Sequence, residues 1–348
     1  MGNKIKIGII FGGRSTEHEV SLVTAESVLK NIDMEKYDIT MIGITKKGQW
    51  LKYAGPINKI STGEWQELAE KEVFHWEECK SFDVIFPLLH GCNGEDGTIQ
   101  GLFELAEVPY VGSGVLGSAL GMDKAYAKII FEREGIPQGD YITFTRKQIY
   151  NDLESVIEHI ESKLEYPCFV KPSNAGSSIG VNKAKDRMEL QKALKIAAEY
   201  DGRILVEEFI NGREVECAVL GNDEPAASTV GEIIPGKEFY DYDAKYKDEN
   251  SRIIIPADLP ADTVELIRNY AVKAFKSLDC SGLSRVDFFV HKETGKVYIN
   301  EINTMPGFTS ISMYPKLWEA SGLPYSKLID KLLELAIERF EDKKRLYY

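Results

Sequence analysis

Two carboxylates and an amide near the end of the chain have the spacing of a metal site. Glu301 and Asn303 stand two apart in the strand-like run VYINEIN, so their side chains leave the same face. A short connection, HKETGK, places Asp287 of SRVDFFV opposite residues 299 to 302. Hard oxygen donors of this kind suit Mg²⁺ shared with phosphates. The alternative is that these residues form only the solvated face of a hairpin. The alternation of polar and apolar residues in the second strand does not exclude this alternative, because Asn300 falls on the expected buried side.

A segment rich in glycine and serine, KPSNAGSSIGVNK, begins at Lys171 and follows the strand-like run YPCFV. Small residues let backbone N–H groups approach an anion, and the lysine adds positive charge. Because the lysine precedes the glycines, the segment does not match the P-loop pattern GxxxxGK[ST]. An ordinary hairpin turn is the alternative, although the polar stretch is long for one. The expected backbone donors are Ser173, Gly176, Ser177, Ser178 and Gly180.

Three further residues stand at helix starts or strand ends. Lys124 opens the helical pattern of MDKAYAKIIFEREG, where it can bind phosphate or simply be solvated. Glu17, in FGGRSTEHEVSL, follows a strand and a Gly-Gly turn, where it can complement the helix dipole or hold a substrate ammonium. His90, in HGCNGEDG, follows another strand end and does not identify a function by itself.

Alternating strand and helix patterns must position these residues. A strand at 5–11, a helix at 20–32 and strands at 37–44 and 82–89 predict a parallel sheet covered by helices. A second unit begins near residue 120, and a third begins with the alternating strand REVECAVLG. We therefore predict an α/β (α+β) chain with three domains. Their predicted ranges are 1–120, 121–206 and 207–348. Within the third, residues 231–252 are long for a connecting loop and predict a lid.

Composition narrows the classes of partner. The chain has 348 residues and a net charge of −13, which argues against nucleic acid and anionic lipid as partners. Its five cysteines are widely spaced without a CxxC pair, which predicts free thiols. The start lacks a signal-peptide pattern, and no uncharged apolar run is long enough to span a bilayer. We predict a cytoplasmic protein that acts on small molecules.

One motif points to a different class. The run GSGVLG, from Gly112 to Gly117, matches the dinucleotide pattern GxGxxG. The acidic residue expected about 20 positions later would be Glu132 or Glu134, and both lie in a helical pattern instead of at a strand end. A nicotinamide-dependent oxidoreductase therefore stays only as an alternative. A non-catalytic ATP-binding protein is a second one.

Seven motifs in this order resemble the D-alanine–D-alanine ligase family of ATP-grasp enzymes: GGRSTEHEVSL, LHGCNGEDGTIQG, GSGVLGSALGMDK, FVKPSNAGSSIGV, YDYDAKY, SRVDFF and NEINTMPGFTSIS. The resemblance covers nearly the whole chain. It implies a three-domain ATP-grasp architecture, in which an N-terminal parallel-sheet domain precedes a central subdomain with the glycine loop and a C-terminal subdomain with the metal site and lid. ATP-grasp enzymes carry a lysine on the strand before a flexible glycine loop that closes over ATP. The GSGVLG motif then lies at the first domain junction.

The resemblance also implies a nucleotide site. The ATP-binding residues would be Lys124, Lys171, Gly176, Ser178, Ile179, Glu207, Glu208, Phe209, Ile210 and Glu214. The family often has lysine at position 208, so the contact there would pass to the backbone of Glu208. Two Mg²⁺ ions, or Mn²⁺ in their place, would be held by Asp287, Glu301 and Asn303.

For the substrates, the resemblance implies two D-alanine sites and a D-alanyl phosphate intermediate, for peptidoglycan precursor synthesis by a homodimer. The residues implied are Glu17 and His90 at the first D-alanine, Ser177 and Tyr246 as a lid latch, Arg285 and the N–H of Gly307 at the oxyanion, and Lys245, Ser312 and Met313 near the second D-alanine. Relatives that form D-lactate esters tend to carry histidine where this chain has Tyr246. The segment YDYDAKY therefore favours dipeptide formation over ligation of D-lactate or D-serine.

Overall fold

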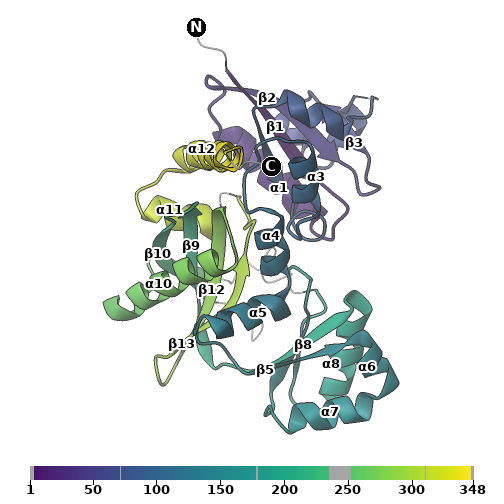
Figure 1. Cartoon of the computed structure of the whole chain (residues 1–348), viewed down its shortest axis with the longest axis vertical. Coiled ribbons are helices and arrows are strands. Elements are labelled where there is room, and N and C mark those ends of the chain that lie inside the picture. Colours follow the sequence, from purple (N-terminus) through teal and green to yellow (C-terminus); the bar gives the residue numbers. More distant parts are fainter. Residues whose placement is uncertain (1–3, 71, 178, 235–251, 310, 346–348) are drawn as a thin grey trace.

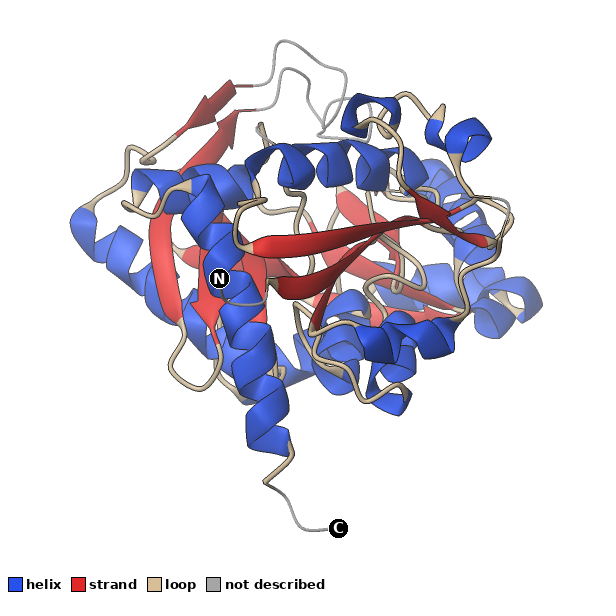
Figure 2. Cartoon of the chain, turned by 90° about the horizontal axis from the view of Figure 1, so that it is seen from above, coloured by secondary structure: helices blue, strands red, loops and turns tan. Residues whose placement is uncertain are grey.

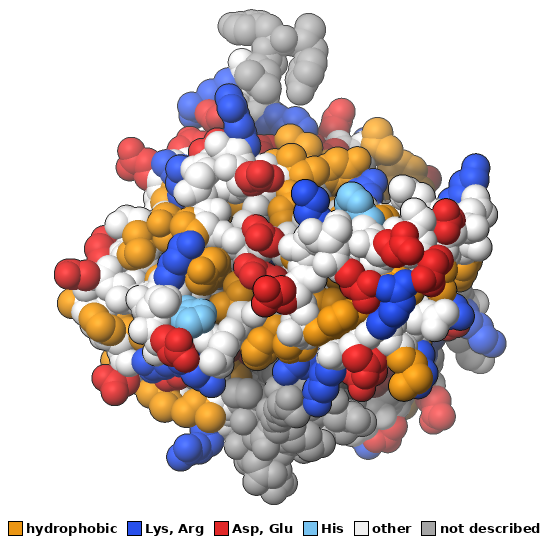
Figure 3. All heavy atoms as spheres, turned by 90° about the horizontal axis from the view of Figure 1, so that it is seen from below, with side chains coloured by type: hydrophobic (Ala, Val, Ile, Leu, Met, Phe, Trp, Pro, Cys, Tyr) orange, Lys and Arg blue, Asp and Glu red, His pale blue; other side chains and the backbone are white. Residues whose placement is uncertain are grey.

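The computed structural model describes residues 4–70, 72–177, 179–234, 252–309 and 311–345. Figure 1 shows three lobes stacked along the long axis, each built around one sheet. Figure 2, seen from above, shows the strands enclosed by helices on several sides. On the face in Figure 3, acidic and basic side chains are interspersed. Among the described residues, none of the helices combines the length and apolar character needed to cross a bilayer.

The N-terminal lobe holds a four-stranded sheet in the order β3-β2-β1-β4. Its strands are β1 (Ile5–Gly12), β2 (Tyr37–Ile44), β3 (Trp50–Tyr53) and β4 (Val84–Leu88). The pairs of β1 with β2 and with β4 are parallel, as predicted, whereas the added strand β3 runs antiparallel to β2. The helices are α1 (His18–Asn31), η1 (Ile57–Lys59), α2 (Trp65–Leu68), η2 (Trp76–Ser81) and α3 (Thr98–Leu105).

Two helices, α4 (Val115–Met122) and α5 (Lys124–Arg133), lead from this lobe to the lowest lobe of Figure 1. Asp123 begins α5, because its side chain accepts hydrogen bonds from two backbone N–H groups of the first turn. The lowest lobe has an antiparallel sheet in the order β5-β8-β6-β7. Its elements are β5 (Tyr141–Thr145), α6 (Arg146–Asn151), α7 (Leu153–Glu161), β6 (Cys168–Pro172), β7 (Asn182–Ala184), α8 (Arg187–Tyr200) and β8 (Arg203–Glu208).

The middle lobe has a five-stranded antiparallel sheet in the order β11-β10-β9-β12-β13. Its elements are β9 (Gly212–Gly221), β10 (Ala226–Ile234), β11 (Arg252–Ile254), α10 (Ala261–Ser277), β12 (Gly282–His291), β13 (Val297–Asn303), α11 (Met313–Ala320) and α12 (Tyr325–Lys343). The predicted lid was too wide, because residues 231–234 belong to β10 and Arg252 to β11. Its remainder, 235–251, lies outside the described residues.

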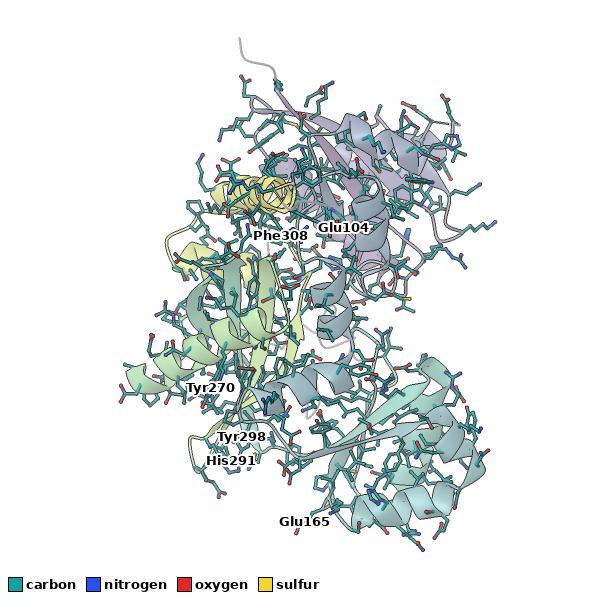
Figure 4. All side chains as sticks on the ribbon, in the orientation of Figure 1. Glu104, Glu165, Tyr270, His291, Tyr298 and Phe308 are labelled. Carbon is teal, nitrogen blue, oxygen red and sulfur yellow. The ribbon has the colours of Figure 1, made fainter. Side chains whose placement is uncertain are left out.

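The first and middle lobes share one apolar core. Phe308 lies beneath α12 and between the two lobes in Figure 4, and its ring centroid is 6.1 Å from that of Phe86 on β4. The same ring lies 5.4 Å from Tyr325 of α12. A continuous cluster of buried side chains from β1, β4, β9 and α12 surrounds these rings. The predicted boundaries at residues 120 and 206 fall within α4 and β8, and they remain predictions.

Candidate active site

A cavity of about 1330 Å³ lies where the three lobes meet. Its lining includes Glu17 and His90 of the first lobe, Lys171 and Glu207 of the lowest lobe, and Arg285 of the middle lobe. Residues that the sequence separates by up to about three hundred positions therefore face one space. Of the residues expected at a site, the following also line it: Lys124, Gly176, Ser177, Glu208, Phe209, Ile210, Glu214, Glu301, Asn303, Gly307, Ser312 and Met313.

One end of the cavity is built on the β12–β13 hairpin. Asp287 pairs directly with Glu301, within the register predicted from the sequence. Arg285 donates two hydrogen bonds of 2.7 Å to the two oxygens of Asp287, and its Nε lies 3.0 Å from the carboxylate of Glu216 on β9. Burial alone lowers the pKa of Arg285, but the two carboxylates raise it well above its usual value. Arg285 is therefore a firmly held cation.

A β-bulge explains why alternation could not assign the faces of β13. Asp287 pairs with Glu301, whereas the next residue, Phe288, pairs with Ile299, so Asn300 is the extra residue. Ile299 is buried while Asn300 and Glu301 both line the cavity. The bulge thus turns two successive polar side chains toward the same space.

The donor set at this end fits a divalent cation. Asp287 and Glu301 supply carboxylates, and Asn303 supplies an amide oxygen that accepts the N–H of Met305 at 3.1 Å. Both carboxylates already bind cationic side chains, because Arg285 holds Asp287 and Lys124 lies 3.3 Å from Glu301. Oxygen donors that attract two protein cations are suited to Mg²⁺ or Mn²⁺ once these side chains turn to other anions.

The other end of the cavity holds one carboxylate between two lysines. Glu207 of β8 forms ion pairs with Lys171 of β6 and, at 3.1 Å, with Lys128 of α5. Lys171 also lies 3.4 Å from the amide oxygen of Asn300. Burial raises the pKa of Glu207, but the two lysines outweigh burial and lower it to about 2. Burial lowers the pKa of Lys171, and Glu207 more than reverses this. The group is ionised at neutral pH.

Apolar and cationic side chains flank this end. The Phe209 and Phe169 rings are 6.2 Å apart, and the Lys183 ammonium lies 4.2 Å from the Phe209 ring centre. A planar base can pack on such a surface. Glu208 accepts the backbone N–H of Asp140 at 3.0 Å, so its side chain is held beside the start of β5.

The glycine loop reaches across to the first lobe. The Ser177 hydroxyl donates to the Glu17 carboxylate, although 160 residues separate them. Ser177 has a φ of 47°, in the left-handed region that a serine rarely adopts. Glu17 is buried, with 7% of its surface exposed. A buried carboxylate that faces the cavity is suited to an ammonium group.

His90 belongs to a second buried network in the first lobe. Its Nδ1 lies 3.1 Å from the Met305 carbonyl and 3.4 Å from the Glu95 carboxylate, while Nε2 lies 3.1 Å from the Thr24 hydroxyl. Because both partners of Nδ1 are acceptors, this nitrogen carries a proton and donates. Burial lowers the pKa of His90, but Glu95 and Glu17 raise it overall. His90 therefore joins the first lobe to the segment that follows β13.

Two of the predicted second-substrate residues, Ser312 and Met313, lie at the start of α11. Ser312 accepts the backbone N–H of Thr309 at 3.0 Å and contacts its hydroxyl at 2.7 Å. A Cβ at Gly307 would lie 3.0 Å from the Ser312 hydroxyl, so any other residue would crowd this corner. Ser178, Lys245 and Tyr246 lie outside the described residues. Ile179, whose N–H donates to the Gly176 carbonyl, is described but lies outside the cavity lining, and so does the buried Asp287.

Sequence reasoning missed Lys128, Asn300 and Glu216. Lys128 stands four residues after Lys124 on one helix, so the spacing placed both lysines on one face. Glu216 had no such signal, because its contact with Arg285 depends on the pairing of β9 with β12.

All five cysteines are free, as the sequence predicted.

The chain is similar in sequence and in fold to known proteins. Residues 6–113 match a family model described as the N-terminus of D-Ala–D-Ala ligase, and residues 130–334 match one for its C-terminus. The chain is 64% identical to D-alanine–D-alanine ligase of Acetivibrio thermocellus, with all of both chains covered. It is 54% identical to the Clostridium acetobutylicum enzyme of the same name, over 97% of this chain and 99% of the relative.

Two solved structures have a similar fold. The VanG D-Ala:D-Ser ligase from Enterococcus faecalis is 42% identical with a TM-score of 0.85, over 96% of this chain and 100% of that one. The D-alanine–D-alanine ligase from Coxiella burnetii is 37% identical with a TM-score of 0.84, over 99% of this chain and 97% of that one.

Proposed function

The chain belongs to the D-alanine–D-alanine ligase family of ATP-dependent ligases, and on this premise we propose that it joins two D-alanine molecules into D-alanyl-D-alanine, a peptidoglycan precursor. One observation carries the proposal: a cation-attracting hairpin, a lysine-flanked carboxylate and the Glu17–Ser177 pair line the same cavity. A nicotinamide-dependent reaction would leave these three groups without a task.

In the first step, the γ-phosphoryl group of ATP transfers to the carboxylate of the first D-alanine, which gives D-alanyl phosphate and ADP. Glu17 would bind the ammonium of this D-alanine, and His90 would lie beside it. Lys124 and Lys171 would leave Glu301 and Glu207 in part to neutralise phosphate oxygens. Glu207 would accept the amino group of adenine, beside Phe209 and Ile210, and Glu214 would meet the ribose.

Divalent cations at Asp287, Glu301 and Asn303, two Mg²⁺ by our proposal, would neutralise charge on the transferring phosphoryl group. Arg285 would turn partly from Asp287 toward the reacting carboxylate, while Glu216 keeps it in place. The arginine is thus available at the point where negative charge develops.

In the second step, the amine of the second D-alanine attacks the acyl carbon and releases inorganic phosphate and a proton. Arg285 and the N–H of Gly307 would stabilise the oxyanion of the tetrahedral adduct. Ser312, whose hydroxyl is oriented by Thr309, would accept or donate at the second carboxylate, with Met313 beside it. Water must be excluded here, because it would hydrolyse the acyl phosphate.

Release of ADP from Mg-ATP with D-alanine tests the reaction. We expect turnover with D-alanine alone and none with L-alanine. Absence of ADP with every amino acid offered would overturn the proposed reaction, even though the fold would stand.

The VanG neighbour supplies a second candidate for the second substrate, because that protein is a D-Ala:D-Ser ligase. D-serine and D-lactate should be offered as second substrates beside D-alanine, and the products separated by mass. We expect D-alanyl-D-alanine as the main product. If the main product instead contained D-serine, the proposed mechanism would stand but the proposed specificity for the second substrate would be wrong.

A homodimer in the cytoplasm is also part of our proposal and follows from the family alone. Size-exclusion chromatography with light scattering tests the dimer, which a mass of about 39.2 kDa, that of one chain, would contradict.

A further inference from the structure

A buried lysine stands directly behind the nucleotide end of the cavity. Lys128 lies on α5, one turn after Lys124, and only 4% of its side chain is exposed. Lys124, Lys171 and Glu207 are among the residues that line the cavity, but Lys128 is not. It therefore touches the site only through another side chain.

The groups around Lys128 fix the position of its ammonium group. Its ammonium lies 3.1 Å from Glu207 and 5.4 Å from the centre of the Tyr141 ring, which offers the negative face of its π system. The Lys128 carbonyl accepts the side-chain N–H of Gln138 at 2.8 Å. A lysine this deeply buried is rare in proteins and needs such partners.

A charge count indicates what Lys128 contributes. Lys128, Lys171 and Glu207 carry two positive charges and one negative charge, which leaves a net charge of +1. Lys171 borders the cavity and can turn to an anion, whereas Lys128 cannot reach one. When Lys171 turns to a phosphate, Lys128 is the cation still in contact with Glu207 among the described pairs.

We propose that Lys128 is a positioning residue that keeps Glu207 an ionised hydrogen-bond acceptor while Lys171 serves the phosphates, and thereby selects nucleotides whose base carries an amino group. This inference rests on the proposed function, because it takes Glu207 as the base-recognising group. Adenine presents an N–H donor at this position, and hypoxanthine presents a carbonyl oxygen that an ionised carboxylate repels. Without Lys128, burial would favour the protonated acid, which donates instead and loses the discrimination.

Binding of ADP and of inosine diphosphate, measured by calorimetry, tests this role without requiring turnover. Loss of one positive charge weakens both nucleotides equally, so the ratio of the two Kd values isolates base selection. For Lys128→Met we expect the ADP:IDP preference to fall by about tenfold, the size of one buried charge-assisted hydrogen bond. The conservative Lys128→Arg should keep most of the preference. Lys192→Met, on the exposed face of α8, is the matched control and should leave both Kd values unchanged.

A double variant keeps the test sharp if Lys128→Met folds poorly. Lys128→Met with Glu207→Gln removes the carboxylate together with the lysine behind it, so this variant contains no buried acid at position 207 whose protonation could change. In the Glu207→Gln background, Lys128→Met should change the ADP:IDP ratio no further.

Two results would overturn the positioning role and leave Lys128 as a structural ion-pair partner. One is an ADP:IDP ratio that Lys128→Met does not change. The other is a change in this ratio by Lys128→Met that is as large in the Glu207→Gln background as in the wild type. If the wild-type protein binds ADP and ligates D-alanine, but Lys128→Met keeps the ADP:IDP preference, then this inference alone is rejected. A wild-type protein that binds no ADP would reject the proposed function with it.

Discussion

The two ends of the cavity use the same kinds of group in opposite proportion. At the nucleotide end, Glu207 lies between Lys171 and Lys128, so two positive charges outweigh one negative charge. At the hairpin end, Arg285 lies between Asp287 and Glu216, so two negative charges outweigh one positive charge. The net charges of these two triads are therefore +1 and −1.

The difference shows how one buried space can bind both an anion and cations. Each end is stable without ligand because every buried charge in its triad has a partner of the opposite sign. Each triad also has one charge in excess, which favours phosphate beside the first triad and a divalent cation beside the second. Ligands exchange these partners, so the buried groups remain paired when the cavity fills.

Removing a carboxylate at the hairpin end should have the largest effect. Asp287→Asn should lower kcat at least about a hundredfold. The variant would bind the divalent cation poorly, and the negative charge on the transferring phosphoryl group would then not be neutralised. ADP release over a range of Mg²⁺ concentrations measures this. Glu293→Gln, in the exposed turn of the same hairpin, is the control and should behave as wild type. Full activity of Asp287→Asn would reject the metal assignment.

A change at the nucleotide end should act on binding more than on chemistry. Glu207→Gln keeps the shape but removes the charge, and we expect the KM for ATP to rise about tenfold with kcat within about threefold. Steady-state kinetics at saturating D-alanine separate the two constants. A large fall in kcat at an unchanged KM would mean that both ends serve the chemical step.

Glu216 sharpens the comparison, because it holds Arg285 without being a proposed metal ligand. Glu216→Gln should lower kcat only about threefold, since Asp287 still orients the arginine. The same ADP assay measures it beside Asp287→Asn. An effect as large as that of Asp287→Asn would assign Glu216 to the reaction itself.

The smallest expected effect concerns acid stability. The pKa of Glu207 is lowered in the folded protein to about 2, below its ordinary 4.5, so its stabilising contribution is present above pH 4.5 and disappears as the pH falls toward 2. When the pH falls from 5 to 3, the Tm of the wild-type protein should therefore decrease by about 2 °C more than the Tm of Glu207→Gln. Circular dichroism melts measure this difference. Equal losses would contradict the charge assignment at this end.

Local patterns predicted much of the fold. The bounds of β2 agree with the prediction at both ends, and those of β1 and β4 agree within a few residues. These segments have strong apolar periodicity and clear turn residues, so the sequence within each is sufficient. The strand β3 was missed because it is short and lies at the sheet edge, with half-buried side chains that give no strong pattern.

Periodicity alone does not predict burial at two positions that border the cavity. In α1, Val23 stands three residues after the buried Val20, at the spacing of one helix face, but it is 45% exposed and borders the cavity. In β13, the bulge at Asn300 interrupts the alternation that the prediction assumed. Both departures lie at the candidate site, where a residue faces the cavity instead of the core.

The sequence alone determined the residue types of the site and the hairpin that sets Asp287 opposite Glu301, because both depend on neighbours in the chain. Only the tertiary structure decided which distant charges meet: Ser177 with Glu17, Arg285 with Glu216, and Lys128 with Glu207. Such pairs depend on how strands and lobes pack, and the free energy of a buried charge depends on its partner in space. The opposite net charges of the two triads therefore emerge only when the lobes come together.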